Sequence, residues 1–153
     1  EKKKSSSSGH QEMQAHPYQG ARFSRAKINA HLALTYFKSG KWQALGELIE
    51  AEALDLHALM LSSPSPYILL RPLSLKIIEE VQRWRSQSGI GLYFTLDAGP
   101  NVHLLFLKKD HTEVLNFLQQ SLVPLFKGEN RLAPYWLWDE VGTGPERLEL
   151  EEK

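Results

Sequence analysis

The sequence contains no cysteine among its 153 residues. A disulfide framework, a thiolate nucleophile and a cysteine-based metal site are therefore excluded. Net charge is lacking as well, because 18 Lys and Arg balance 18 Asp and Glu. No overall field attracts the chain to nucleic acid or to an anionic membrane, so we expect neither as a partner.

Long apolar runs are also missing, since none approaches the ~20 residues that a membrane span requires. The basic start at Lys2 to Lys4 is not followed by an apolar segment, so it does not resemble a secretory signal. We therefore expect a cytoplasmic location. The chain begins at Glu1 and not at methionine, which favours a piece of a longer protein, although a processed or tagged protein would look the same. Its length suits a single domain, 1–153, with one core.

Apolar residues recur at steps of three and four in four segments, which predicts helices over 21–39 and 41–61, from Ser74 to near Gly89, and from Asp110 onward. Gly40 separates the first two, so they should pack as an antiparallel hairpin. Ser74 is expected to cap the third helix, and Asp110 with Glu113 resembles a capping box. The predicted apolar stripes are Phe23, Ala26, Ala30, Ala33 and Phe37 in the first helix, and Leu45, Leu48, Ile49, Ala53, Leu56 and Met60 in the second.

Two segments rich in aromatic and aliphatic residues, 92–96 and 102–107, are predicted to be strands. The five residues between them, from Asp97 to Asn101, make the pair a β-hairpin. The run 67–70 is predicted as a strand or an extended connector, and 135–140 as a last strand. Helices that alternate with a small antiparallel sheet indicate an α+β domain, with the helices on one face of the sheet.

Asp97 is the first candidate for chemistry, because it ends a strand that is predicted to be buried. A carboxylate held there in a partly desolvated cleft could accept a proton or stabilise developing positive charge. The alternative is that Asp97 starts an Asx-turn, with Gly99, Pro100 and Asn101 as ordinary turn residues. Spacing alone favours this local interpretation, since Asp and Asn are common in turns.

The run Ser5-Ser6-Ser7-Ser8-Gly9-His10 is the second candidate. Hydroxyl groups beside a glycine can line a phosphate site, because the backbone can approach the anion closely. Without further support, a flexible Ser/Gly linker is the better explanation of the run.

Other residue types give no clear site. The six histidines lack the spacing of metal ligands, so we interpret them as surface or helix-packing residues. Trp136 and Trp138 lack the basic neighbours of a nucleic-acid stacking platform, which favours a core or interface position. The glycines do not complete a dinucleotide fingerprint or a P-loop, so no nucleotide site is predicted within this chain.

Taken together, several segments resemble the C-terminal part of the diphosphomevalonate decarboxylases, a family of the GHMP kinase superfamily. The most specific is Phe94-Thr95-Leu96-Asp97-Ala98-Gly99-Pro100-Asn101-Val102-His103-Leu104-Leu105, which is similar to the family's strand–turn–strand signature. The resemblance runs in order from Lys3 to about Pro145. Its other parts are Lys3-Lys4-Ser5-Ser6 with Gly9-His10, Glu50 to Leu54 with His57 to Met60, and Asp139 to Pro145.

The resemblance implies a ferredoxin-like GHMP kinase C-terminal domain, the substrate-side half of a two-domain enzyme whose N-terminal ATP-loop domain is absent from this chain. The implied reaction uses ATP and Mg²⁺, bound mainly by that absent domain, and converts diphosphomevalonate to isopentenyl diphosphate, ADP, phosphate and CO2. Asp97 matches the catalytic aspartate. The implied substrate-binding residues are Ser5, Ser6, Gly9, His10 and Ala98, with the two serines at the phosphate end.

The implied partners are a phosphorylated small molecule and the protein's own N-terminal domain, and a homodimer is left open. His10 stands where many members have methionine and Ser7 where some have arginine, which leaves the phosphate count of the substrate undecided. Two alternatives therefore remain. One is a sister enzyme, a mevalonate-monophosphate decarboxylase or a mevalonate 3-kinase, and the other is a non-catalytic ferredoxin-like binding or dimerisation module.

Overall fold

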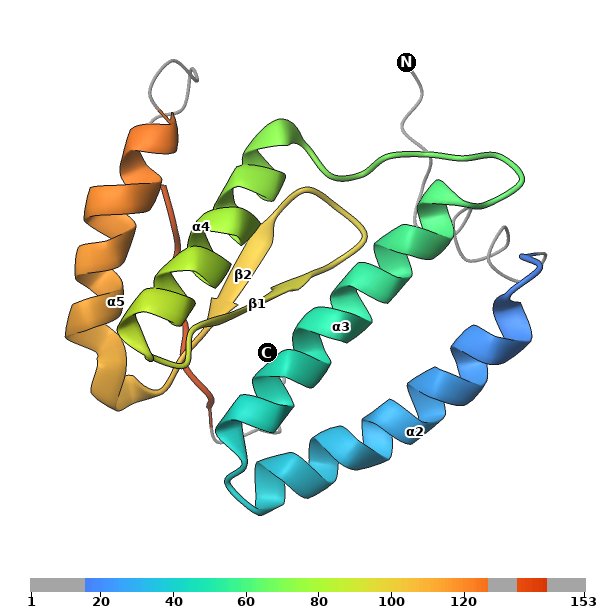
Figure 1. Ribbon diagram of the computed structural model, residues 1–153, viewed down its shortest axis with the longest axis horizontal. Helices are drawn as coiled ribbons and strands as arrows, with labels where there is room; N and C mark the ends of the chain where they lie inside the picture. Colours follow the sequence, from blue (N-terminus) through green and yellow to red (C-terminus); the bar gives the residue numbers. More distant parts are fainter. Residues whose placement is uncertain (1–15, 127–134, 143–153) are drawn as a thin grey trace, which may run out of the picture.

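The computed structural model describes residues 16–126 and 135–142. Within these ranges, helices and a two-stranded antiparallel sheet form an α+β domain, which confirms the predicted class (Figure 1). The main elements are α2 (Gln19–Lys38), α3 (Trp42–Leu61), α4 (Pro72–Ser88), β1 (Tyr93–Leu96), β2 (Val102–Leu105) and α5 (His111–Phe117). None of the helices in the described part of the chain is long and apolar enough to cross a membrane.

The predicted helical hairpin is confirmed, because α2 and α3 lie side by side and antiparallel (Figure 1). Gly40 makes the turn between them with a φ of 65°, in the left-handed region that glycine adopts at little cost. The contact between the two helices includes polar pairs: Arg22 and Asn29 of α2 both reach Glu52 of α3, at 2.8 and 2.5 Å.

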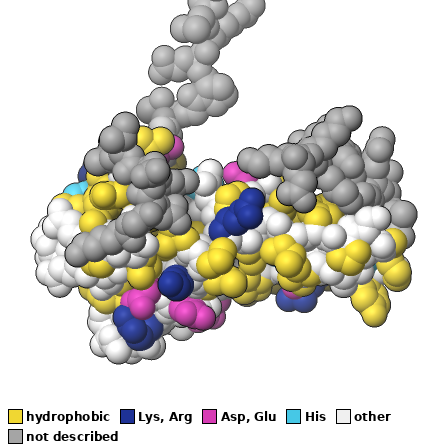
Figure 2. Space-filling model, turned by 90° about the horizontal axis from the view of Figure 1, so that it is seen from above, with side chains coloured by type: hydrophobic (Ala, Val, Ile, Leu, Met, Phe, Trp, Pro, Cys, Tyr) yellow, Lys and Arg dark blue, Asp and Glu magenta, His cyan; other side chains and the backbone are white. Residues whose placement is uncertain are grey.

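The predicted apolar stripe of α2 is wrong at both ends. Phe23 is 43% exposed and Phe37 is 68% exposed, whereas Asn29 is buried. The polar side chains that pair with Glu52 take the positions facing α3, so the large apolar residues of α2 point elsewhere. Hydrophobic side chains reach the surface over much of the face shown in Figure 2, with charged side chains among them.

The buried face of α3 also differs from the predicted stripe. Leu48, Ile49 and Leu56 are only half-buried. The buried residues follow the same helical spacing but include two polar ones; they are Leu45, Gly46, Glu50, Ala53, His57 and Met60. The two polar residues are stable there because each finds hydrogen-bond partners on β1 or just beyond it.

Helix α4 begins two residues earlier than predicted, at Pro72, whose fixed φ and missing N–H suit the first helical position. Arg71 is the N-cap, so Ser74 does not hold the N-cap position, but its side chain does contribute to the capping box as the N3 residue. Ser74 lies in the first turn and accepts the Arg71 backbone N–H at 3.4 Å. The predicted end is confirmed, since Gly89 adopts a φ of 70° at the C-cap.

The β-hairpin is confirmed, with Tyr93 opposite Leu105 and Leu96 opposite Val102. Strand β1 packs against α3 and α4, and α4 also contacts β2. The core lies between α4, β1 and the helical segment after β2, where Val81, Phe94 and Val114 are fully buried. The Trp84 ring of α4 stacks on Phe117 of α5 at 4.7 Å between ring centres, which closes this core.

The segment after β2 is less regular than predicted. Helix α5 is short; it follows a 3-10 turn, Lys108–Asp110, and continues as a π-helical turn, Leu118–Leu122, and a 3-10 turn, Val123–Phe126. Pro124 lacks an N–H and cannot continue an α-helical ladder, so the backbone changes its hydrogen-bond spacing there. Asp110 makes no side-chain capping bond, so the predicted capping box does not form.

Two further segments with a possible strand pattern form no strand in the described structure. Residues 67–70 form an extended connector, one of the two predicted alternatives. Residues 135–140 form no strand, so that prediction is wrong. Their aromatic side chains pack against other rings instead, as Trp138 does against Phe106 at 6.1 Å and Trp136 at 6.2 Å, and this packing does not need a strand ladder.

Candidate active site

Asp97 follows β1 directly, and the strand is buried as predicted: Phe94 is inaccessible and Leu96 is 5% exposed. The Asp97 side chain, by contrast, is 89% exposed. The described residues therefore place the carboxylate at the tip of a buried strand but do not enclose it. The desolvated cleft that we expected around it is not formed by these residues alone.

The turn that contains Asp97 is not an Asx-turn in the described structure. Among the described residues, the Asp97 carboxylate accepts no backbone N–H of the turn, and its contact is with Nε2 of His103, at 3.5 Å. His103 pairs with Thr95 across the hairpin, and alternation along a strand places residues 95 and 97 on the same side. The carboxylate is therefore not used to form the turn and remains accessible to a ligand. A residue whose role is only to form the turn would not need this accessibility.

Two buried side chains hold the backbone of this turn. Nε2 of His57, in α3, lies 3.1 Å from the Asp97 carbonyl oxygen. The Ser74 hydroxyl, in α4, donates to the Pro100 carbonyl oxygen at 2.6 Å. Within the turn, the Gly99 N–H donates to the Asp97 carbonyl at 2.7 Å. Both ends of the turn are therefore tied to long helices.

His57 is 3% exposed, and burial lowers its pKa from the ordinary value of 6.5, although the contact with the Asp97 carbonyl acts in the opposite direction. Burial disfavours the imidazolium form, because a charged ring loses its hydration there. Since a carbonyl oxygen only accepts, we assign the proton of the neutral ring to Nε2. His57 is therefore a neutral hydrogen-bond donor to the backbone of Asp97.

A buried ion pair fixes β1 below the turn. Arg85 of α4 makes two bonds to the Glu50 carboxylate of α3, at 2.6 and 2.9 Å, and donates to the Leu92 carbonyl at 2.6 Å. Glu50 also accepts the backbone N–H of Phe94 at 3.2 Å. The guanidinium lies 4.6 Å from the centre of the Tyr93 ring. The strand that carries Asp97 is thus anchored to two helices through charged groups.

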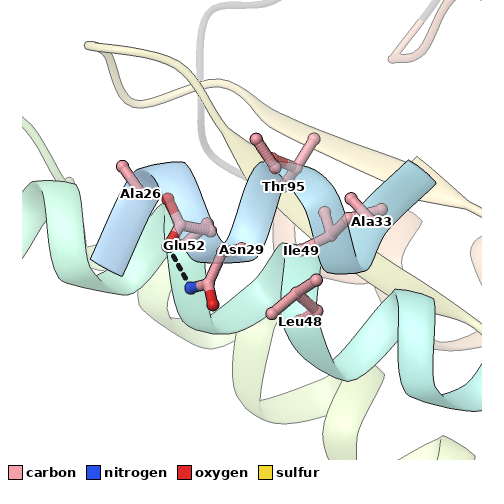
Figure 3. Close-up of a pocket in the computed structure, with 8 residues that line it drawn as sticks. Ala26, Asn29, Ala33, Leu48, Ile49, Glu52 and Thr95 are labelled. Carbon is pink, nitrogen blue, oxygen red and sulfur yellow. Dashed lines mark hydrogen bonds between the residues drawn. The ribbon is translucent and has the colours of Figure 1, made fainter. Parts of the chain in front are cut away.

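An open pocket of about 280 Å³ lies beside the same strand. Thr95 of β1 forms part of its wall, together with residues of α2 and α3, and the Asn29–Glu52 hydrogen bond crosses it (Figure 3). Most of the lining is apolar; it consists of Ala26, Asn29, Ala30, Ala33, Leu48, Ile49, Glu52 and Thr95. Asp97 is not part of this lining, so the pocket alone does not define the site.

The other predicted site residues are placed only in part. Ala98 is exposed beside Asp97 in the turn. Ser5, Ser6, Gly9 and His10 lie outside the described residues, so their role in substrate binding stays a prediction. No group of three or more His, Asp or Glu residues in the described ranges is arranged to hold a metal ion.

Sequence reasoning missed His57, Ser74 and Glu50 as residues that support the site. It interpreted His57 as one of several surface or helix-packing histidines, placed Glu50 and His57 in a segment that resembles the family without giving either a role, and interpreted Ser74 as a helix cap. One signal was available: Glu50 and His57 are seven residues apart and lie at helical spacing with Ala53 and Met60. A polar residue on such a face needs a partner when buried, although the sequence does not say which one.

The fold and this geometry define an α+β domain that presents an aspartate on a buried, doubly tethered hairpin. Residues 1–145 match the family model described as "Mevalonate 5-diphosphate decarboxylase C-terminal domain". The chain belongs to this family, which confirms the resemblance found in the sequence.

Comparisons with individual proteins agree with this family membership. The rat (Rattus norvegicus) diphosphomevalonate decarboxylase is 29% identical over 108 residues, which cover 67% of this chain and 27% of that protein. The solved mevalonate pyrophosphate decarboxylase of Streptococcus pyogenes is 32% identical, with a TM-score of 0.73, over 79% of this chain and 38% of that one. A structure described as MDDEF in complex with MVAPP, AMPPCP and magnesium is 30% identical, with a TM-score of 0.72, over 79% and 37%. The chain thus spans well under half the length of these relatives.

Proposed function

We propose that this chain supplies the substrate-side half of an ATP-dependent decarboxylase that converts diphosphomevalonate to isopentenyl diphosphate, ADP, phosphate and CO2. The observation that carries the proposal is Asp97: it lies at the end of a buried strand, in a turn held from two helices, with its carboxylate exposed and unbonded to that turn. The family match includes this hairpin.

In this proposal the Asp97 carboxylate lies beside the tertiary 3-hydroxyl of the substrate. It orients the hydroxyl and accepts its proton as the oxygen attacks the γ-phosphoryl group of ATP. The phosphorylated oxygen then leaves as phosphate and takes up the proton that Asp97 had accepted, so Asp97 is ionised again while positive charge develops on the carbon that carried the oxygen. The same carboxylate stabilises that charge until the loss of CO2 supplies the electrons of the new double bond.

ATP and Mg²⁺ are assigned mainly to the part of the enzyme that precedes this chain in its relatives. The carboxylates of the described residues are not grouped to hold Mg²⁺. When bound, Mg²⁺ would neutralise charge on the phosphates of ATP. If the N-terminal half of the enzyme packs over the hairpin, it would enclose the Asp97 carboxylate and exclude water from it.

The exposed apolar surface of α2 is consistent with contact to a partner domain. Ile28, Leu34 and Phe37 are between 59% and 68% exposed. Exposed apolar patches of this kind are typical of protein interfaces. We propose that the protein's own N-terminal half packs against this domain in a cytoplasmic enzyme, and a homodimer is a further use for the same surface.

The test is an assay of the complete enzyme with Mg·ATP and three substrates: diphosphomevalonate, mevalonate monophosphate and mevalonate. The proposal predicts release of CO2 and phosphate with a marked preference for the diphosphate. Preference for the monophosphate would assign the sister decarboxylase, and ADP formation without CO2 would assign a 3-kinase. No turnover of any of the three would support a non-catalytic module.

A further inference from the structure

We propose that His57 and Ser74 are positioning residues for the Asp97 carboxylate, and that they act by fixing the two ends of the turn 97–101 from two different helices. This inference rests on the proposed function of Asp97. Neither side chain reaches the position of the carboxylate, so their effect passes through the backbone of the turn.

The need for such positioning follows from the exposure of Asp97. Its side chain is 89% exposed, and the described residues touch its carboxylate through His103 alone, itself a half-exposed side chain at 3.5 Å. One long contact between exposed groups in water holds a side chain weakly. The direction of the carboxylate is therefore set mainly by the orientation of the Asp97 backbone, from which the short side chain projects.

The two tethers are suited to fixing that orientation. His57 is 3% exposed and Ser74 is 2% exposed, so neither competes with water for its carbonyl partner. Helix α3 has 20 residues and α4 has 17, and both pack against the hairpin. Because one tether acts at Asp97 and the other at Pro100, they restrain rotation of the turn as well as its distance from the core.

The hydroxyl of Ser74 is itself oriented. It accepts the Arg71 backbone N–H at 3.4 Å, which directs its own proton toward the Pro100 carbonyl at 2.6 Å. His57 has a comparable constraint, since the Asp97 carbonyl requires the Nε2–H tautomer. Both donors are thus arranged before any substrate binds, which is the condition for positioning to lower a reaction barrier.

A positioning role differs from a purely structural one in the kinetic constant that changes. Displacement of a reacting group by about 1 Å can cost on the order of 10²-fold in rate. Substrate affinity would change little, because the phosphate end is held elsewhere, so kcat should fall while KM stays similar. Loss of stability alone would reduce the amount of folded enzyme without changing kcat per folded molecule.

The test compares His57→Phe, His57→Gln and the control His16→Phe in the complete enzyme, with active-site concentration measured. His16 is a buried histidine, 4% exposed, whose Nε2 contacts Ser62 and not the turn. We expect His57→Phe to lower kcat roughly 10- to 100-fold with KM within about twofold. His57→Gln, whose amide N–H reaches a similar position, should recover most of kcat, and His16→Phe should retain it.

A second pair keeps the inference testable if His57→Phe does not fold. Ser74→Ala removes the donor to Pro100, whereas Ser63→Ala removes an equally buried hydroxyl that donates to Met60 at 3.1 Å. Ser74→Ala should lower kcat at least several-fold and Ser63→Ala should not. Unchanged kcat in Ser74→Ala, and in His57→Phe where that variant folds, beside a marked loss in Asp97→Asn, would overturn the positioning role alone. A wild-type enzyme without decarboxylase activity would overturn the proposed function as well.

Discussion

The Glu50 carboxylate accepts the backbone N–H of Phe94 at 3.2 Å and so joins the middle of α3 to β1. The same carboxylate is paired with Arg85, so it connects α3, α4 and the strand at one point. Glu50 is 7% exposed and the Arg85 side chain 22%. Three consecutive elements of the fold, α3, α4 and β1, therefore depend on one buried acidic group.

Removal of this group should destabilise the chain markedly. Glu50→Ala leaves the Arg85 charge without its partner and the Phe94 N–H without its acceptor, which should lower the free energy of unfolding by about 3 kcal/mol. Glu47→Ala, one turn earlier on the exposed face of α3, should change it by less than about 0.5 kcal/mol. Urea unfolding followed by circular dichroism measures both, and similar losses would contradict the assignment of Glu50.

A substitution at Gly46 should test the close packing of α3 on β1. A Cβ atom built at Gly46 lies 2.2 Å from atoms of the Tyr93 ring, so the helix or the ring has to move. We expect Gly46→Ala to lower the free energy of unfolding by about 1 to 3 kcal/mol. Gly20→Ala in α2 meets no atom within 4 Å and should be neutral or stabilising by up to about 1 kcal/mol.

If α3 moves away from β1 in Gly46→Ala, the Trp42 environment should change too. The Trp42 and Tyr93 rings meet edge to face at 5.7 Å between centres. Tryptophan fluorescence and thermal unfolding of the two glycine variants provide the comparison. A Gly46→Ala protein as stable as Gly20→Ala would contradict the close packing of α3 on β1.

The buried state of His57 predicts a pH dependence of stability. Its pKa is lowered in the folded chain by burial, whereas the unfolded chain takes up a proton near 6.5. The unfolded state then binds more protons as pH falls below about 6.5, so folding stability falls with it until the lowered folded pKa is reached. The contribution is present in full above pH 6.5. Urea unfolding at pH 7.5 and 5.5 should show a larger loss for the wild type than for His57→Gln, and equal losses would contradict this role of His57.

The chain by itself should not bind nucleotide appreciably. The sequence predicts no glycine-rich phosphate loop, and the proposal assigns ATP to the other half of the enzyme. Isothermal titration of the 153-residue chain with Mg·ATP should give no measurable heat of binding at micromolar concentrations. One-to-one binding in the micromolar range would place the nucleotide site here and would require a different division of roles between the two halves.

The elements with a strong local signal were predictable. Gly40 and Gly89 end helices where their left-handed φ values occur, and the hairpin around Asp97 follows from two apolar runs that flank turn residues. The strand expected over 135–140 does not form, because its aromatic residues find ring contacts elsewhere. Local propensity cannot reveal such a tertiary preference.

The roles of His57 and Ser74 in holding the turn were not predictable either, because their contacts depend on tertiary packing. His57 lies 40 residues from Asp97, and Ser74 lies 26 residues from Pro100. In the sequence His57 is one polar residue in an apolar helix, and Ser74 resembles a helix cap. Only the packing of α3 and α4 against the hairpin brings their donors to the two carbonyls. Asp97 itself was found because its neighbours in the turn resemble a known family.

The measurement that tests the central claim most directly is the turnover of Asp97→Asn in the complete enzyme. Asn fits the same turn and retains the backbone contacts with His57 and Gly99, so the substitution removes little except the negative charge. We expect kcat for CO2 release to fall on the order of 10²-fold or more, with KM for diphosphomevalonate nearly unchanged. Turnover close to that of the wild type would contradict the assignment of Asp97 as the group at the reacting centre.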